Sequence, residues 1–172
     1  MKHPFYIIVA VDKNGGIGKA GTLPWKFKKE FAYFRKVTTD TTDKGKQNML
    51  IMGRKTWESI SENFRPLKGR KNVVLTSVND YNAAGATVIS SLDAALEMTD
   101  EKIEKVFIIG GGQVFNEAIS HPDLTGIYLT KVHAKYDCDT FFPKILEDFK
   151  RVKKIGNDEE EKIKFEYFLL SK

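Results

Sequence analysis

The 172-residue chain has one cysteine, Cys138, which excludes an internal disulfide and fits a reducing, cytoplasmic compartment. Its three histidines are scattered, so no zinc-type cluster is expected and we predict no metal site. No run approaches the roughly 18 apolar residues that span a bilayer. The first residues lead directly into an apolar stretch without a cleavage-site pattern, so we expect neither a membrane segment nor a signal peptide.

The overall composition is typical of a globular protein, with 41% hydrophobic, 12% aromatic and 30% charged residues. The length predicts a single domain over residues 1–172. Lys and Arg exceed Asp and Glu to give a net charge of +5, which favours anionic partners. Charge alone leaves nucleic acid, a membrane surface and a small phosphorylated ligand open.

Short apolar runs alternate with helix-like patterns, which predicts an α/β fold with a mainly parallel sheet and flanking helices. From residue 125 onward no crossover helix is evident, so we expect an antiparallel C-terminal edge. The charged string 158–164 indicates a solvated hairpin turn. The expected strands are 5–11, 49–52, 73–75, 87–89, 106–109, 127–132 and 165–170, and the expected helices are 26–37, 56–61, 92–98 and 113–119.

One carboxylate falls on the apolar face of the first predicted helix. Phe27, Phe31 and Phe34 are spaced i, i+4 and i+7, and Glu30 lies three residues after Phe27. A carboxylate that points inward must be hydrogen-bonded or have a raised pKa. Glu30 is therefore either a partly exposed residue at the edge of the stripe, or an acid that holds a flat, amidine-like heterocycle through two parallel hydrogen bonds.

A glycine-rich segment, residues 14–25, precedes this helix. Four glycines within seven residues predict a flexible loop that can approach a ligand closely, and Leu23-Pro24-Trp25 anchors its end. The segment lacks the ending of a phosphate-binding P-loop. It is either a surface turn or a lid over the site that contains Glu30.

Two predicted strands run directly into glycine and then a helix, at Gly53 and at Gly110-Gly111-Gly112. Each turn offers backbone N–H groups to an anion, and two such turns suit a dinucleotide. The alternative is tight helix-to-strand packing. The triple glycine does not match the Rossmann pattern, whereas Arg54 and Lys55 suggest the extra phosphate of NADP.

A basic turn at residues 65–71 enters the next strand. Most turns of this kind are solvated. If Arg70 faces the pocket, however, its guanidinium can bind a substrate carboxylate through two hydrogen bonds.

With these motifs in order, the chain resembles the dihydrofolate reductase family along nearly its whole length. The resemblance implies an eight-stranded sheet and the reduction of 7,8-dihydrofolate to tetrahydrofolate with NADPH. Two departures are Phe115, where many members have Tyr, and Ser77, where vertebrate members have Arg. The matching segments are 8–11, 16–18 with 23–25, 30–34, 51–57, 65–70, 109–112, 129–130 and 139–143.

By position, the resemblance implies that Glu30 binds the pterin and assists proton delivery to N5, and that Thr130 bonds Glu30 or a water beside it. Arg70 is expected to pair with the folate α-carboxylate. The other expected substrate residues are Ile8, Val9, Leu23, Phe31, Phe34, Arg35, Ile60 and Ile109. The expected cofactor residues are Ala10, Gly16, Ile17, Gly18, Lys19, Ala20, Gly21, Thr22, Gly53, Arg54, Lys55, Thr56, Leu75, Thr76, Ser77, Ile109, Gly110, Gly111, Gly112, Gln113, Val114 and Phe115.

Two other functions compete with this one. A reductase of the same fold can act on a ribosylaminopyrimidine, although Glu30 together with Arg70 favours folate. A basic nucleic-acid-binding module is disfavoured because the aromatics fall at core spacings and the basic residues are spread along the chain. We expect a monomer that binds dihydrofolate and antifolate inhibitors and has no nucleic-acid or membrane partner.

Overall fold

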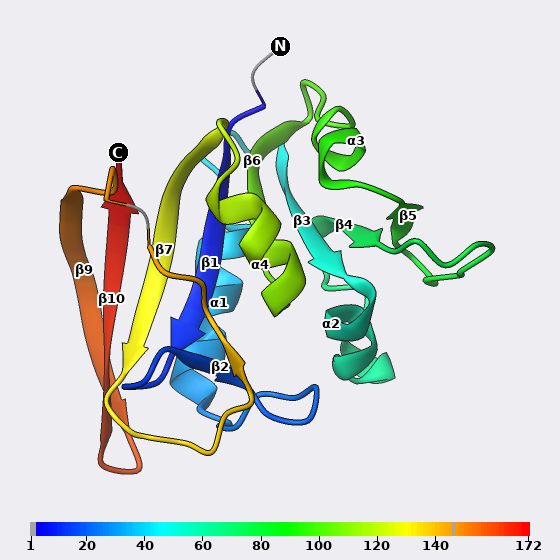
Figure 1. Cartoon of the computed structure of the whole chain (residues 1–172). Helices are drawn as coiled ribbons and strands as arrows, with labels where there is room; N and C mark the ends of the chain where they lie inside the picture. The colour runs from blue at the N-terminus through cyan, green and yellow to red at the C-terminus, as the bar shows by residue number, and fades with distance from the viewer. Residues whose placement is uncertain (1–2, 146) are drawn as a thin grey trace.

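The computed structural model describes residues 3–145 and 147–172, and within them eight strands form one twisted sheet (Figure 1). The strands are β1 (Phe5–Val11), β3 (Gln47–Gly53), β4 (Arg70–Leu75), β5 (Thr87–Ile89), β6 (Ile103–Ile108), β7 (Leu124–Val132), β9 (Arg151–Glu160) and β10 (Ile163–Ser171). Their order across the sheet is β5-β4-β3-β6-β1-β7-β10-β9.

The pairing is parallel from β5 through to β7, and β10 runs antiparallel to both β7 and β9. The central strands are apolar on both faces, and Leu50, Ile51 and Met52 of β3 are fully buried. A parallel sheet covered by helices on both sides requires such continuous apolar strands. The predicted fold class, including the antiparallel C-terminal edge, is confirmed.

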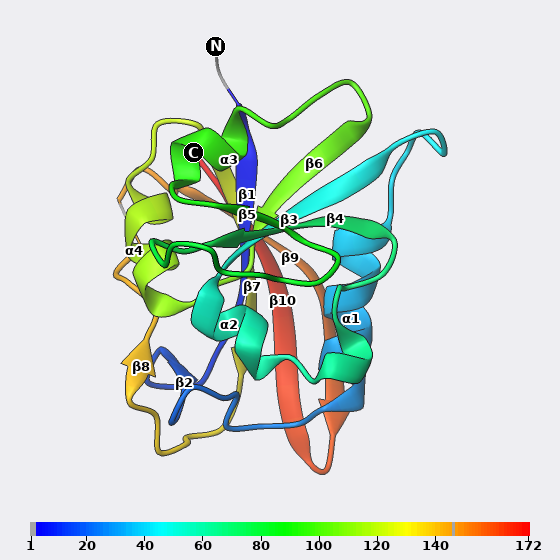
Figure 2. The same ribbon diagram turned by 90° about the vertical axis from the view of Figure 1, so that its right-hand side faces the viewer.

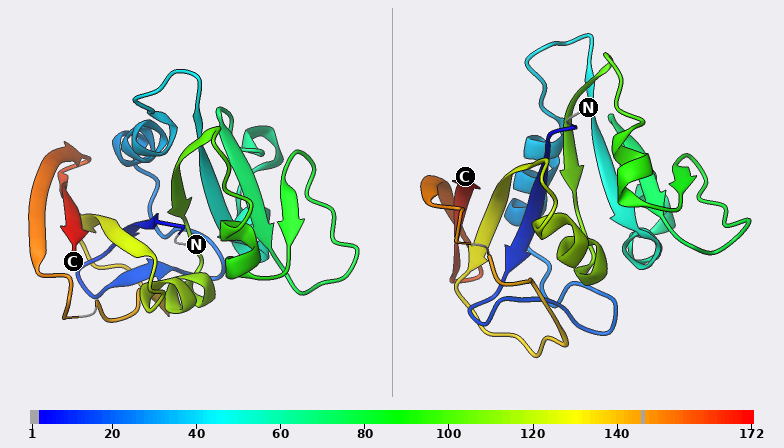
Figure 3. Two further views of the ribbon diagram at one scale, coloured as in Figure 1. Left: turned by 90° about the horizontal axis from the view of Figure 1, so that it is seen from above. Right: turned by 45° about the horizontal axis from the view of Figure 1, so that its top comes forward.

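The helices cover the two faces of the sheet in pairs. They are α1 (Lys28–Thr39), α2 (Arg54–Ser59), α3 (Leu92–Leu96) and α4 (Gly112–Ile119), with a short 3-10 helix η1 (Glu62–Phe64) after α2. Viewed from above, α1 and α2 lie on one side and α3 and α4 on the other (Figure 3, left). Trp57 of α2 packs in the core on the first side, and Phe115 of α4 packs in the core on the second.

The first helix begins later than the phenylalanine spacing predicts. Phe27 is the residue before α1, and it packs against Phe165 of β10 with the ring centroids 5.0 Å apart. Phe31 is exposed, so the predicted stripe of three phenylalanines is wrong. The residues of α1 that are buried are Glu30 and Thr38, which confirms that Glu30 points inward.

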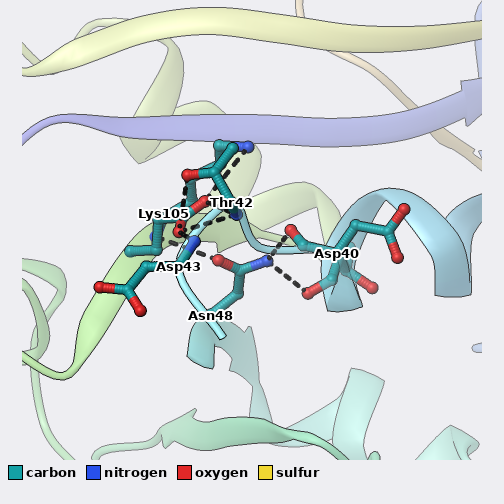
Figure 4. A network of polar contacts seen from close by, with 7 residues as sticks. Asp40, Thr42, Asp43, Asn48 and Lys105 are labelled. Atoms are coloured by element: carbon teal, nitrogen blue, oxygen red, sulfur yellow. Dashed lines mark hydrogen bonds and ion pairs between the residues drawn. The ribbon is translucent and has the colours of Figure 1, made fainter. Parts of the chain in front are cut away.

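The far end of α1 is tied to the sheet by polar contacts (Figure 4). The amide of Asn48 donates to the carbonyls of Thr38 and Asp40 and accepts from the backbone N–H of Lys105. The carboxylate of Glu104 accepts from the backbone N–H groups of the loop that follows the helix. A buried amide on β3 that satisfies groups from the end of α1 and from β6 holds these three segments in one arrangement.

Three strands were not predicted. β9 is a polar edge strand without an apolar pattern, and β2 (Gly16–Gly18) and β8 (Thr140–Phe141) form a separate small sheet. The predicted hairpin turn is correct in position but too long, because residues 158–160 belong to β9 and only Glu161 and Lys162 adopt positive φ angles. No helix in the described ranges is long and apolar enough to cross a membrane.

Candidate active site

Glu30 lies in the first turn of α1 and is 7% exposed. Burial raises the pKa of its carboxyl to about 7, because a low-dielectric surrounding disfavours the charged form. In residues 3–145 and 147–172 no hydrogen bond to its side chain is present. At neutral pH this group is therefore divided between the acid and the carboxylate, which is the condition for a general acid.

Two tyrosines stack beside this acid. The rings of Tyr33, one turn along α1, and Tyr167 of β10 lie 3.7 Å apart and nearly parallel. Their buried hydroxyls have no hydrogen-bond partner in the part of the chain described. Burial, and then the charges of Asp158, Glu30 and Glu160, raises the pKa of Tyr167 to about 12. Both phenols therefore stay neutral around Glu30.

Thr130 lies on β7, opposite Ala10 of β1 and Tyr167 of β10. It is buried, and because side chains alternate along a strand it faces the same side of the sheet as Tyr128. Tyr128 packs in the core that also contains Phe34. Within the described ranges Thr130 makes no direct hydrogen bond to Glu30, so the expected contact with a water beside Glu30 stays a prediction.

The expected apolar wall of the substrate site is partly assembled. Four of its members pack in one core between the sheet and helices α1 and α2: Ile8, Phe34, Ile60 and Ile109. The side chain of Val9 packs in the core on the opposite face, so only its backbone can reach this side. Leu23 and Phe31 are each 42% exposed, and Arg35 is also exposed.

Arg70 begins β4 and is 9% exposed. It donates from Nη1 to the hydroxyl of Thr38 and from Nε to the carbonyl of Lys68. Burial, and then the positive charge of Arg35, lowers its pKa. No carboxylate pairs with it among the described residues, so the guanidinium is held in place with Nη2 available for an anion.

The two glycine turns meet at the carboxyl ends of the neighbouring strands β3 and β6. The backbone N–H of Gly53 donates to the carbonyl of Gly110 over 2.8 Å, and the Gly110–Gly111 peptide bond is cis. A Cβ on Gly111 would lie 3.2 Å from the hydroxyl of Thr56, and Gly110 has a φ of 119°. Glycine thus allows the N-termini of α2 and α4 to converge, where their N–H groups can bind phosphate.

The basic residues expected near the cofactor are at the surface of this edge. Arg54 at the start of α2 pairs with Glu58 through Nη1, at 2.9 Å and 3.1 Å to the two oxygens. Lys55 and Ser77 are exposed. The hydroxyl of Thr76, just after β4, accepts from the backbone N–H of Val78. Because the Arg54–Glu58 pair is partly exposed, a charged ligand group can compete with Glu58 for the guanidinium.

The remaining residues expected to bind the cofactor are partly in the core and partly at the surface. Ile17 and Phe115 pack in the core on the α4 side, together with Val114, and Leu75 packs against that core. The ring of Phe115 meets that of Phe142 edge-on at 5.2 Å. Gln113 is exposed. Ala10 packs on the other side, in the core that contains Trp25.

The glycine-rich segment contains a short strand and an isolated β-bridge. Gly16–Gly18 forms β2 and pairs with β8, and Lys19 and Thr22 pair with each other across the turn that contains Ala20 and Gly21. Asp12 accepts from the N–H groups of Gly16 and Tyr136. Asp139 accepts from Ala20 at 2.9 Å. These contacts attach the segment to residues 134–142, and its expected flexibility and role as a lid stay predictions.

Three residues at this site were missed by sequence reasoning. Asp12 follows the first strand directly and Asp139 opens a segment that matches the family, so both had a local signal. Tyr167 had none, because it approaches Glu30 from a strand far along the chain. In the described ranges no three His, Cys, Asp or Glu side chains gather as a possible metal site.

Fold and site together define an α/β enzyme with one buried acid, an arginine oriented by two hydrogen bonds, and two glycine turns. The sequence model of the family described as dihydrofolate reductase matches residues 4–172. The chain is 41% identical over 177 residues to the dihydrofolate reductase of Drosophila melanogaster, covering 98% of this chain and 97% of that protein. It is 40% identical over 182 residues to that of Sus scrofa, covering 98% of each.

A solved structure supports the same family. The dihydrofolate reductase of Schistosoma mansoni superposes with a TM-score of 0.84 at 36% identity, covering 99% of both chains. A bifunctional dihydrofolate reductase-thymidylate synthase of Glycine max is 41% identical over 153 residues, which is 84% of this chain but 29% of that protein. The chain belongs to the dihydrofolate reductase family, and this confirms the predicted family and enzyme class.

Proposed function

We propose that the chain reduces 7,8-dihydrofolate to 5,6,7,8-tetrahydrofolate with NADPH, and that residues 1–172 act as a single domain. This reduction is the reaction of the family to which the chain belongs. The observation that carries the proposal within the chain is Glu30, a buried acid with a pKa of about 7 on the helix beside the sheet. The reaction needs one proton at pterin N5 besides the hydride at C6, and one acid suffices.

Glu30 is proposed to bind the amino and N3 groups of the pterin and to assist the proton's delivery to N5, through water or the pterin itself. The apolar side chains of Ile8, Phe34, Ile60 and Ile109 exclude water from one side of the ring. Thr130 completes the polar end of the pocket. In a low-dielectric site the hydrogen bonds to a carboxylate are strong, so the pterin is held in one orientation.

Arg70 is proposed to bind the α-carboxylate of folate. Its Nη1 and Nε are already engaged by Thr38 and Lys68, so the group keeps its direction before substrate arrives. Arg35 adds a second positive charge near this end of the site. Two neighbouring guanidiniums with no carboxylate partner among the described residues favour an anionic substrate tail.

The cofactor proposed for the two glycine turns is NADPH, which supplies the hydride when bound. Its pyrophosphate fits the converging N-termini of α2 and α4, where a Cβ on Gly53 would come within 3.2 Å of Val114. Thr56 can donate from its hydroxyl there. Arg54, Lys55, Thr76 and Ser77 are proposed to surround the 2′-phosphate, and residues 16–22 with Ala10, Ile109 and Phe115 the nicotinamide half.

We also propose a cytoplasmic monomer that binds antifolate inhibitors. A flat heterocycle with an amidine-like edge pairs with Glu30 in the same way as the pterin, which is the basis for inhibitor binding. The free thiol of Cys138 suits a reducing compartment. Sedimentation equilibrium tests the monomer, and a folded mass of two chains contradicts it.

The test of the function is the loss of NADPH absorbance with dihydrofolate present. We expect turnover by the wild-type chain and a loss of at least about 100-fold in Glu30→Gln, the usual size of a general-acid contribution. Well-folded protein without turnover contradicts the function. Turnover only with a ribosylaminopyrimidine assigns the chain to the other reductase reaction instead.

A further inference from the structure

The first turn of α1 is capped by a residue that lies far along the chain. The two carboxylate oxygens of Glu160, at the end of β9, accept from the backbone N–H groups of Lys28 and Lys29, each at 3.0 Å. Phe27, the residue before the helix, provides no side-chain cap. Figure 2 shows the start of α1 and the tip of the β9–β10 hairpin at the same lower end of the molecule.

A lysine holds the same two elements together. The ammonium of Lys29 donates to the carbonyl of Glu159 over 3.0 Å and pairs with the carboxylate of Asp158 at 3.1 Å. The backbone of Lys29 bonds to Glu160, and its side chain bonds to the two preceding residues of β9. The hairpin and the helix end are thus joined by backbone, side-chain and charge contacts.

Glu30 is the third residue of this helix, one position after the capped N–H groups. A glutamate at that position commonly folds back to cap its own helix. Glu30 points into the interior instead and makes no such bond among the described residues. Its burial leaves the helix start without a local cap, and Glu160 replaces it with a negative charge at the positive end of the helix dipole.

The charged and titratable groups around Glu30 come from four elements, including Tyr128 of β7, which adds to the effect of burial in raising the pKa of Tyr33. Tyr33 lies on α1 and Tyr167 on β10, and the charge of Glu30 acts on the pKa of both. From β9, the charges of Asp158 and Glu160 act on Tyr167 as well. Of these groups Asp158 is paired with Lys29, whereas within residues 3–145 and 147–172 Glu160 accepts only from backbone N–H groups.

We propose that Glu160 is a positioning residue for Glu30: its carboxylate fixes the first turn of α1 and so keeps the Glu30 side chain directed into the buried pocket. The inference rests on the proposed function only in what Glu30 does to substrate. The capping geometry and its effect on Glu30 do not depend on which substrate the chain reduces.

The test measures the titration of Glu30 by carbon NMR of its carboxyl, assigned as the signal that Glu30→Gln lacks. Glu160→Gln removes the charge and one of the two acceptor oxygens of the cap, so the first turn should loosen and Glu30 should gain exposure to water. Because burial raises the pKa of Glu30, its titration midpoint should then fall by about half a pH unit. Glu160→Asp keeps the charge on a shorter side chain, so its shift should be smaller. The matched control is Glu159→Gln, which removes the same charge from the neighbouring residue and keeps its carbonyl.

The order of the shifts decides the inference. A midpoint that falls most in Glu160→Gln, less in Glu160→Asp and not in Glu159→Gln supports it. Equal shifts in Glu160→Gln and Glu159→Gln, or a shift in Glu160→Asp as large as in Glu160→Gln, overturns it. The titration needs no turnover, so it is independent of whether dihydrofolate is reduced. In active protein the pH profile of hydride transfer should move with the midpoint.

Discussion

The guanidinium of Arg70 donates a hydrogen bond from Nη1 to the hydroxyl of Thr38, 2.9 Å away at the far end of α1. Thr38 in turn donates to the carbonyl of Phe34. The helix that carries Glu30 near its start therefore also holds the arginine near its end. One rigid element sets the distance between the proposed sites for the pterin and for the carboxylate tail.

Arg70→Lys should raise the KM for dihydrofolate at least about tenfold, because an ammonium keeps the charge but loses the planar pair of donors. The kcat should change little, since the tail is remote from the reacting atoms. Steady-state kinetics measures both. Lys68→Ala is the control, because it removes a charge from the same turn and leaves the guanidinium in place.

Thr38→Val should raise the same KM by a smaller factor, about two- to fivefold, since it removes one hydrogen bond of about 1 kcal/mol that orients Arg70. A dihydropterin without the glutamate tail serves as the comparison substrate for both variants. If its KM rises as much as that of dihydrofolate, Arg70 does not bind the tail.

Glu30→Gln should stabilise the protein at high pH. The carboxyl has a pKa of about 7 when folded and 4.5 in its ordinary state, so the folded protein binds the proton more tightly. The free energy of unfolding therefore falls as pH rises from 4.5 to 7 and levels off above that. The glutamine avoids this loss, which amounts to about 3 kcal/mol.

Urea unfolding at pH 4.5 and pH 8 measures the difference. The variant should gain stability relative to the wild type at pH 8 and have nearly the wild-type stability at the lower pH. A gain that is the same at both pH values shows that ionisation of Glu30 is not its cause.

Glu58→Gln should improve the use of NADPH. Glu58 engages Arg54 at the surface, and a 2′-phosphate must compete with it for the guanidinium. Removing the charge frees Arg54, so the KM for NADPH should fall about two- to threefold, the effect of a weak exposed pair. Arg54→Ala should raise that KM. Neither change should alter the KM for NADH, and equal effects on both cofactors contradict the contact.

Gly16→Ala should displace the strand β2 and lower turnover. A Cβ at this position would lie 2.4 Å from the sulfur and 2.6 Å from the Cβ of Cys138. Because both atoms belong to a side chain, Cys138→Gly in the same protein should restore part of the activity. Single-turnover kinetics of the two variants and of Cys138→Gly alone checks this, and an unrelieved loss in the double variant argues against steric crowding.

The sequence predicted the buried strands well because their apolar runs reflect burial on both faces, as in Met49 to Met52 of β3. β9 could not be predicted in this way. It is an edge strand whose two large apolar residues, Val152 and Ile155, are exposed, so no periodicity marks it. Edge strands are often polar in this way, which limits pairing with other chains.

The sequence predicted those site residues whose position follows from spacing along the chain. Glu30 was identified from its spacing to Phe27, and the inward direction is correct although Phe27 lies before the helix. The contacts of Glu160 and Tyr167 with this region depend on the register of β10 against β7 and β9, which no local pattern encodes. When residues come together only through tertiary pairing, their roles can be assigned only from the structure.

The cap on α1 also bears on how the chain folds. Lys29 and Glu160 are 131 residues apart, so during synthesis the helix emerges from the ribosome long before its cap exists. Contacts between such distant residues form late, since the loop between them must close first. We therefore expect the first turn of α1 to complete only when the β9–β10 hairpin docks, so that the acid gains its final setting late in folding.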